Sequence, residues 1–113
     1  MKTLIVIGLV LAAASAARAD FYTGNDLYAR CKDNRLIAAG YIMGFSDGSK
    51  LTEIFDDHAV LKICMPTGVQ NFQLVDMVCK HLEERPAQRH TSASWFVQTV
   101  LQDAYACPTE KKR

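Results

Sequence analysis

Apolar residues recur along this chain at the spacing of α-helices, and no run alternates well enough between apolar and polar residues to indicate a strand. The pattern predicts four helices, over about residues 24–31, 34–55, 67–85 and 91–107. We therefore expect an all-α fold, a small disulfide-bonded bundle of about four helices. There is no internal repeat and no linker rich in Pro or Ser, so residues 20–113 are expected to form a single domain.

Capping residues and a proline suggest where these helices begin and end. Asn25 or Asp26 is available to cap the first helix, and Thr67-x-x-Gln70 matches a capping box for the third. Pro86 is expected to end the third helix, because proline has no amide proton and disfavours helical geometry in the residue before it.

Each of the three longer helices has a row of apolar residues that we expect to face the core. In the second helix the row is Ile37, Tyr41, Phe45, Leu51 and Phe55. In the third it is Phe72, Val75, Val78, Cys79 and Leu82. In the fourth, which should start near Thr91 or Ser92 and end before Pro108, it is Ala93, Phe96, Val97, Val100, Leu101 and Ala104.

Three glycines recur every four residues inside the second helix: Gly40, Gly44 and Gly48. A glycine inside a helix costs roughly 1 kcal/mol relative to alanine, so three on one face indicate that another backbone packs closely there. Two interpretations stay open at this point. The glycines contact a helix of the same chain, or they contact a second subunit.

The N-terminus has the layout of a secretory signal peptide. Lys2 precedes an apolar run from Leu4 to Ala14, and Ala17-Arg18-Ala19 is an Ala-x-Ala cleavage site. The run is too short for a membrane span, which needs about twenty residues. We expect residues 1–19 to be removed before Asp20, which leaves a periplasmic protein with no membrane contact. A buried N-terminal helix is the alternative.

The remaining chain is small and nearly neutral. Removing 19 of the 113 residues, Lys2 and Arg18 among them, leaves 94 residues with 11 basic and 12 acidic side chains, a formal charge of −1. This balance argues against nucleic acid as a partner.

All four cysteines lie in this part of the chain, and an even number in a small exported domain predicts two disulfides. If the last three helices run up, down and up, Cys64 and Cys107 meet at one end of the bundle. Cys31 then lies towards the other end, nearer Cys79. We therefore expect the pairs Cys64–Cys107 and Cys31–Cys79.

The sequence offers no catalytic or metal site that we would propose. Cys79 and His81 are close in sequence, but side chains two residues apart point to different sides of a helix. We expect Cys79 in the core or in a disulfide. His58, His81 and His90 are scattered, and no CxxC or HxxxH pair exists. The expectation is a protein that is not an enzyme and has no metal and no cofactor.

A set of landmarks along the chain resembles one family. They are Cys31, Gly40-Tyr41-Ile42-Met43-Gly44-Phe45-Ser46-Asp47-Gly48, Cys64-Met65-Pro66-Thr67-Gly68-Val69, Gln73-Leu74 and Cys107. In order and spacing they resemble the Tai/Rap family of periplasmic immunity proteins, which neutralise peptidoglycan amidases delivered by type VI secretion systems. The resemblance covers nearly all of residues 20–113. It departs at Ala38, where the family often has a cysteine, and at Cys79, which is extra.

The resemblance implies a small all-α protein that blocks a secreted amidase by binding, and that is commonly a dimer. Together with the glycines, it leads us to expect a symmetric homodimer. Its patch would comprise Gly40, Tyr41, Gly44, Phe45 and Gly48, with the two aromatic residues as anchors. A small periplasmic helical chaperone or stress protein is the alternative. A hydrolase is disfavoured because the sequence has no recognisable nucleophile–base pair.

The turn between the third and fourth helices is the expected contact with the amidase. It is polar, and Pro86 limits its flexibility, which lowers the cost of ordering it on binding. The residues expected to make contact are Arg85, Pro86, Gln88, Arg89 and His90. Arg85 and Arg89 could engage carboxylates, and His90 could reach a catalytic group. An ordinary solvated connection, or contact through residues 57–63 instead, are the alternatives.

Overall fold

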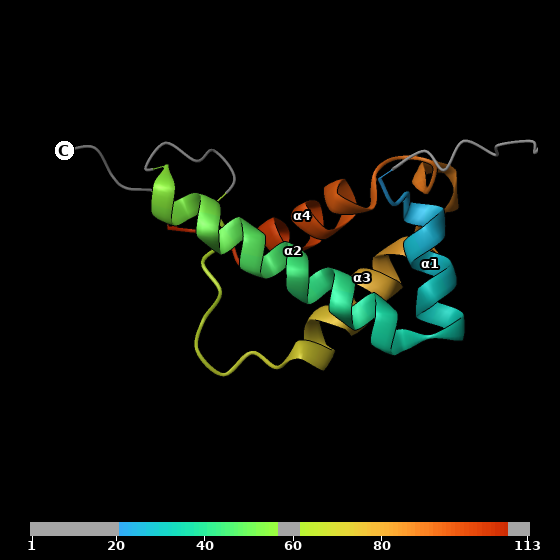
Figure 1. The fold of residues 1–113 in the computed structure, drawn as a ribbon, viewed down its shortest axis with the longest axis horizontal. Helices are drawn as coiled ribbons and strands as arrows, with labels where there is room; N and C mark the ends of the chain where they lie inside the picture. Colours follow the sequence, from blue (N-terminus) through green and yellow to red (C-terminus); the bar gives the residue numbers. More distant parts are fainter. Residues whose placement is uncertain (1–20, 57–61, 109–113) are drawn as a thin grey trace, which may run out of the picture.

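The computed structural model describes residues 21–56 and 62–108, so the expected signal peptide and its cleavage site lie outside the described residues. The helices are α1 (Gly24–Asp33), α2 (Arg35–Phe55), α3 (Asn71–Glu84) and α4 (Ala93–Ala104), with a short 3-10 helix, η1 (Pro86–Gln88), between the last two. In Figure 1, α2 and α4 run in the same general direction and α3 runs back. The described residues contain two isolated β-bridges and no strand. The all-α prediction is confirmed.

The first two helices are capped by side chains that precede them. The Asp26 N–H donates to Thr23 Oγ1 (3.2 Å), and the Thr23 N–H donates to the Asp26 carboxylate (2.9 Å), which together form a capping box. The predicted cap at Asn25 or Asp26 was therefore wrong, because Asp26 is the third helical residue of this box. Asn34 ends α1 and caps α2.

The third helix begins later than the Thr67-x-x-Gln70 pattern predicted. Thr67 and Gly68 form a turn, and Gly68 has φ of 97°, a left-handed conformation that favours glycine. Gln70 is the N-cap instead, and its N–H donates to the Gln73 side chain at 2.7 Å. At its other end α3 stops two residues before Pro86, as predicted.

The core lies where α1, α3 and α4 meet one side of α2. The residues predicted to face inwards from α3 and α4 are buried, with two exceptions: Phe72 is 65% exposed, and Ala104 is exposed. Leu74, which the predicted row omitted, is buried. The buried apolar residues are Leu27, Cys31, Ala38, Ile42, Leu74, Val75, Val78, Cys79, Leu82, Ala93, Phe96, Val97, Val100 and Leu101. Within the described residues, no helix is both long enough and apolar enough to cross a bilayer.

The second helix is turned differently from the prediction. Its buried residues are Ala38 and Ile42. The predicted row spreads over two sides of the helix: Ile37, Leu51 and Phe55 are exposed, and Tyr41 and Phe45 are half-buried against the core. At 100° per residue the row covers an arc of about 120°, and only its Tyr41 and Phe45 edge adjoins the buried side of the helix. The other three helices cover the side that carries Ala38 and Ile42.

Two disulfides tie the helices together. Cys31–Cys79 joins α1 to α3 inside the core, and Cys64–Cys107 joins the connection before α3 to the segment after α4. These are the same pairs that the topology led us to expect. They span 48 and 43 residues of sequence, and they leave no cysteine with a free thiol.

We predict that the two disulfides differ in their rate of reduction. Cys31 and Cys79 are each less than a tenth exposed, whereas Cys64 is exposed and Cys107 half-buried. A thiolate must reach a sulfur to reduce the bond, so limiting dithiothreitol should open Cys64–Cys107 first. Alkylation of the released thiols followed by peptide mapping reads the order. Labelling of Cys31 or Cys79 first, or a peptide that links Cys31 to Cys107, would contradict this arrangement.

Candidate functional site

The turn between α3 and α4 is a short connection with regular structure of its own. The last turn of α3 stops at Glu84, η1 follows at once, and α4 begins at Ala93 with Ser92 as its cap. The Ser92 hydroxyl accepts a hydrogen bond from the Trp95 N–H at 3.1 Å. Proline stands at the first position of η1, where its missing amide proton costs nothing. The turn is therefore bounded on both sides by well-defined helix ends.

Backbone hydrogen bonds hold this turn against the start of α1. The Asn25 N–H donates to the Arg89 carbonyl at 2.7 Å, and the Gly24 N–H donates to the Thr91 carbonyl at 2.7 Å. The Ala93 N–H donates to the Tyr22 carbonyl at 2.8 Å. The free amides of a helix N-terminus thus find their acceptors in the turn. Three backbone hydrogen bonds thus join residues 22–25 to residues 89–93 and hold the turn in place.

Gly24 allows this close approach. A Cβ at this position would lie 2.7 Å from the Phe96 ring and 2.9 Å from the Arg89 carbonyl oxygen. Any larger residue would push the turn away from α1. The glycine thus fixes the distance between the first helix and the turn.

Arg89 does not extend into solvent as expected. Its guanidinium carbon lies 3.9 Å from the centre of the Tyr28 ring, and the Lys32 ammonium lies 4.2 Å from the centre of the same ring. Both contacts are cation–π interactions. Arg89 therefore packs on Tyr28 and supports the turn from behind.

The side chains that remain open on the turn are those of Arg85, Pro86, Gln88 and His90, all exposed. His90 Nδ1 lies 3.0 Å from the Ala87 carbonyl oxygen, which orients the ring within the turn. The structure thus brings the predicted residues together on one connection, but with two different roles. Arg89 holds the turn, and the others face outwards.

The glycines of α2 lie on the side of the helix away from the core. No atom of the described residues, apart from the neighbouring backbone of α2, lies within 4 Å of the place a Cβ would take at Gly40, Gly44 or Gly48. Contact with another described helix of the same chain, one of the two interpretations, is thereby contradicted. Exposed apolar side chains border the glycines on the same side: Leu36, Ile37, Leu51, Ile54 and Phe55. We call this surface of α2 the glycine face.

Tyr41 and Phe45, the expected anchors of this patch, turn towards the bundle instead. The Tyr41 ring stacks on Tyr22 with centroids 5.4 Å apart, and Phe45 packs against the core. Burial raises the pKa of Tyr41, and a hydrogen bond with Ser94 partly offsets this effect. The apolar border of the glycine face comes from other residues than those predicted.

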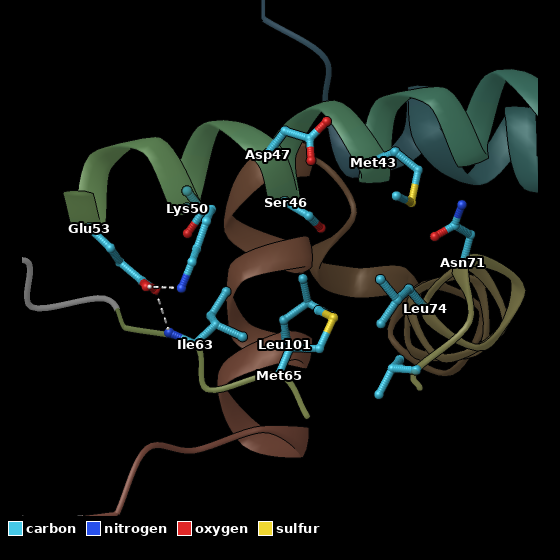
Figure 2. Close-up of a pocket in the computed structure, with 12 residues that line it drawn as sticks. Met43, Ser46, Asp47, Lys50, Glu53, Ile63, Met65, Asn71, Leu74 and Leu101 are labelled. Atoms are coloured by element: carbon cyan, nitrogen blue, oxygen red, sulfur yellow. Dashed lines mark hydrogen bonds and ion pairs between the residues drawn. The ribbon is translucent and has the colours of Figure 1, made fainter. Parts of the chain in front are cut away.

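A cleft of about 240 Å³ opens between the C-terminal half of α2, residues 63–69 and the start of α3. Figure 2 shows Met43, Met65, Leu74 and Leu101 around its interior, with Asp47 and Lys50 on α2 above. Methionine side chains adapt readily to different apolar partners. Residues 57–61 of the alternative binding connection lie outside the described residues, and Ile63 lines this cleft.

Glu53 holds one wall of the cleft in place. Its carboxylate accepts a hydrogen bond from the Ile63 N–H at 3.1 Å and pairs with the Lys50 ammonium at 3.3 Å (Figure 2). The Ile63 hydrogen bond is the main reason that the pKa of Glu53 is lowered, and Lys50 and Lys62 add to this against the opposing effect of burial. The segment is also fixed by the Cys64 N–H, which donates to the Tyr105 carbonyl at 2.9 Å.

His81 lies in a groove between α3 and α4 rather than beside a nucleophile. Burial, and then the charge of Arg85, lower its pKa, and its ring meets Phe96 edge-on at 5.8 Å. Its sequence neighbour Cys79 is bonded to Cys31. Among residues 21–56 and 62–108, no group of three or more His, Cys, Asp and Glu side chains is placed to hold a metal ion.

These features coincide with a match to a known family. Residues 23–107 match the Rap1a immunity protein family. The matched range runs from the cap of α1 to Cys107 and includes both disulfides. The chain belongs to the Rap1a immunity protein family. Membership confirms the resemblance and implies immunity against a type VI effector that the protein binds. Comparison with curated proteins and with solved structures finds no match.

Sequence reasoning missed the residues that position the turn of this immunity protein. Tyr22 and Gly24 precede or begin α1, and Tyr28 lies within it, so nothing local connects them to residues 89–93. The sequence contains a signal for the position of Gly24 but not for its role. Thr23 and Asp26 have the spacing of a capping box, which places Gly24 at the start of a helix. That its amide and its missing side chain serve the turn follows only from the tertiary structure.

We predict that Gly24→Ala destabilises the immunity protein by about 1–3 kcal/mol, because the new methyl group must displace Phe96 or the Arg89 backbone. Chemical denaturation with intact disulfides measures the change in free energy of unfolding. Asn25→Ala is the matched control, since its side chain is exposed and its amide bond to Arg89 remains. Equal stability of Gly24→Ala and wild type would show that the turn is not packed against α1 as described.

We predict that Glu53 makes the stability of this protein depend on acid pH. Its pKa in the folded state is below the usual 4.5, so its contribution is complete above that pH and is lost as the pH falls through the lowered pKa. Glu53→Gln should therefore be less stable than wild type at pH 7, by about 1 kcal/mol. The difference should shrink towards pH 3. Denaturation curves across this range test it, and a difference that stays constant would contradict the assignment.

Proposed function

We propose that this immunity protein is exported to the periplasm through residues 1–19, with cleavage before Asp20. There it binds and blocks a type VI secreted peptidoglycan amidase, and it supplies no catalysis of its own. The family match over residues 23–107 is the observation that carries the proposal. The pairing of all four cysteines is in keeping with an oxidising compartment.

The turn between α3 and α4 is the proposed contact with the amidase. An enzyme with a Cys/His site in a cleft is blocked by any rigid protrusion that fills the cleft, with no chemistry needed from the inhibitor. The three backbone bonds to the start of α1 and the packing of Arg89 on Tyr28 support this choice. A loop that is ordered before binding loses little entropy when it binds. Arg85, Gln88 and His90 then provide the polar contacts.

We propose further that the protein works as a homodimer. The support is the glycine face, an apolar surface of α2 that the described part of the chain leaves open. The face shares no residue with the turn. A dimer of this kind would keep both turns of the pair available for an effector.

We predict that the triple substitution of Arg85, Gln88 and His90 by serine, with Pro86 and Arg89 retained, abolishes protection when the amidase is co-expressed in the periplasm. Binding of the purified proteins should weaken at least thirtyfold, since hot-spot residues contribute about 2 kcal/mol or more. Calorimetry or biolayer interferometry measures the change, with the product of the neighbouring reading frame as the first amidase candidate to test. Circular dichroism and thermal melting should match wild type, because these side chains make no core contact.

Two controls separate the possible outcomes. Lys80→Glu changes an exposed charge on α3 outside the turn and should leave protection intact. Met65→Glu places a charge in the cleft that lies before α3. If the turn variant still protects and Met65→Glu does not, the effector binds at the cleft. If wild type itself does not bind the amidase, the amidase assignment is wrong.

A further inference from the structure

His81 is a titratable side chain that lies against the core and that the proposed function does not use. Its Nε2 atom is inaccessible to solvent and has no hydrogen-bond partner among the described residues. Its ring meets the Phe96 ring edge-on, with the two centroids 5.8 Å apart. Phe96 is buried, so one side of the imidazole faces apolar surroundings. Most buried polar atoms in proteins have a partner, and one without a partner calls for an explanation.

The Phe96 contact connects His81 to the turn between α3 and α4. A Cβ at Gly24 would lie 2.7 Å from Phe96 and 2.9 Å from the Arg89 carbonyl oxygen, so Gly24 packs directly against both. The next residue, Asn25, donates its N–H to the same Arg89 carbonyl. His81, Phe96 and Gly24 therefore form a continuous packed series that ends at the turn. A movement of the His81 ring alters the support of the backbone bonds that hold the turn.

The other side of the His81 ring borders an open groove of about 420 Å³ between α3 and α4. Glu84 lines this groove from α3, and Asp103 lines it from α4. Lys80 lines it as well and pairs with Glu84 at 4.0 Å. An imidazolium that turned into the groove would find solvent and two carboxylates, which the side next to Phe96 does not provide. The groove is therefore a second position for the ring, and it suits the charged form.

Burial and the nearby charges act on His81 in opposite directions, and burial prevails. Burial lowers the pKa of His81, and the positive charge of Arg85 at the end of α3 lowers it further, whereas Asp103 and Glu84 raise it. Arg89 on the turn packs against α1 instead. The pKa is thus lower in the folded protein than in the unfolded chain, so the fold favours the neutral ring. By linkage, the folded arrangement is fully stable above the usual pKa of 6.5 and loses stability as the pH falls below it.

We propose that His81 is a pH-sensitive switch that controls how firmly the turn is held. At neutral pH the uncharged ring lies against Phe96 and supports the turn through it. When the ring takes up a proton from solvent, Nε2 becomes a charged donor without an acceptor, and burying such a group is costly. The ring then moves into the groove towards the two carboxylates, and Phe96 loses its support. The backbone bonds from Gly24 and Asn25 to the turn consequently open more often.

A consequence for effector binding follows, and it rests on the proposed role of the turn. A segment that is ordered before binding loses little entropy when it binds, so a loosened turn holds the effector less tightly. The immunity protein should therefore bind its effector more weakly at pH 5 than at pH 7. The loosening itself is a property of the free chain and does not depend on which partner the turn contacts.

The first experiment follows amide hydrogen exchange of the oxidised chain 20–113 by NMR between pH 7 and pH 5, without any effector. After correction for the intrinsic pH dependence of exchange, the protection of the Gly24 and Asn25 amides should fall by about threefold or more. The Cys64 amide, which donates to Tyr105 at the far end of α4, should keep its protection. Unchanged protection of Gly24 and Asn25 would overturn the switch.

The same samples identify the group that titrates. The ring protons of His81 should titrate with a pKa below 6.5, and a pKa above that value would overturn the proposal, because protonation would then stabilise the fold. His81→Phe keeps an aromatic ring beside Phe96 and should remove the pH dependence of the protection. If this variant does not fold, His81→Gln, which is neutral throughout the range, provides the same test. Loss of the pH dependence in His90→Gln, with wild-type behaviour in the His81 variant, would place the sensor on the turn and refute His81.

The second experiment compares binding of the purified effector to wild type and to His81→Phe, or to His81→Gln in its place, at pH 7 and pH 5. Any titration of the effector affects both proteins equally and cancels in the comparison. The dissociation constant should rise on acidification by about threefold more for wild type than for the variant. Loosening of the turn with no such difference in binding would support the switch and overturn the turn as the effector contact. The failure of one proposal is thus distinguished from the failure of the other.

Discussion

The Cys31–Cys79 disulfide is the constraint on which the arrangement of helices depends. It lies in the core and joins the end of α1 to the middle of α3, and the whole of α2 lies in the loop that it closes. A domain of this size buries a limited fraction of its surface, so its core alone gives modest stability. Closing a loop of about fifty residues removes roughly 4 kcal/mol of entropy from the unfolded chain in the chain-entropy model. The second disulfide then fixes residues 62–70 to the end of α4, the part of the fold with least secondary structure.

Helix existence could be predicted from this sequence because it depends on local chemistry, whereas the side of α2 that is buried could not. Val75, Val78 and Leu82 form the dominant apolar row in the sequence of α3, and these residues are buried in the structure. α2 has apolar residues on two sides, and the local pattern does not say which side the other helices cover. The larger side chains suggested the wrong one. The side that the other helices cover is instead the one that carries Ala38 and Ile42.

The candidate turn shows the same limit at the level of single residues. Pro86 could be read from the sequence as the end of α3, and it placed the turn correctly. The difference between Arg85 and Arg89 could not be read, since both are arginines on one polar connection. It arises because Tyr28, sixty residues away in the chain, offers its ring to one guanidinium and not to the other. The need for glycine at position 24 could not be read from the sequence either. It arises because Phe96 and the Arg89 carbonyl lie so close to Gly24 that they leave no room for a side chain.

The three glycines of α2 cost the isolated subunit stability without any return inside the described fold. Together they weaken the helix by roughly 3 kcal/mol relative to alanine, a large part of the 5–15 kcal/mol that typical domains have. A glycine in an exposed helix is explained when a backbone has to pass close to it, and the described helices do not do so. The turn presents the opposite case, in which a glycine, three backbone bonds and a stacked arginine all act within the chain to hold an exposed segment rigid. The turn is thus held in place within the single subunit, whereas no described helix covers the three glycines of α2.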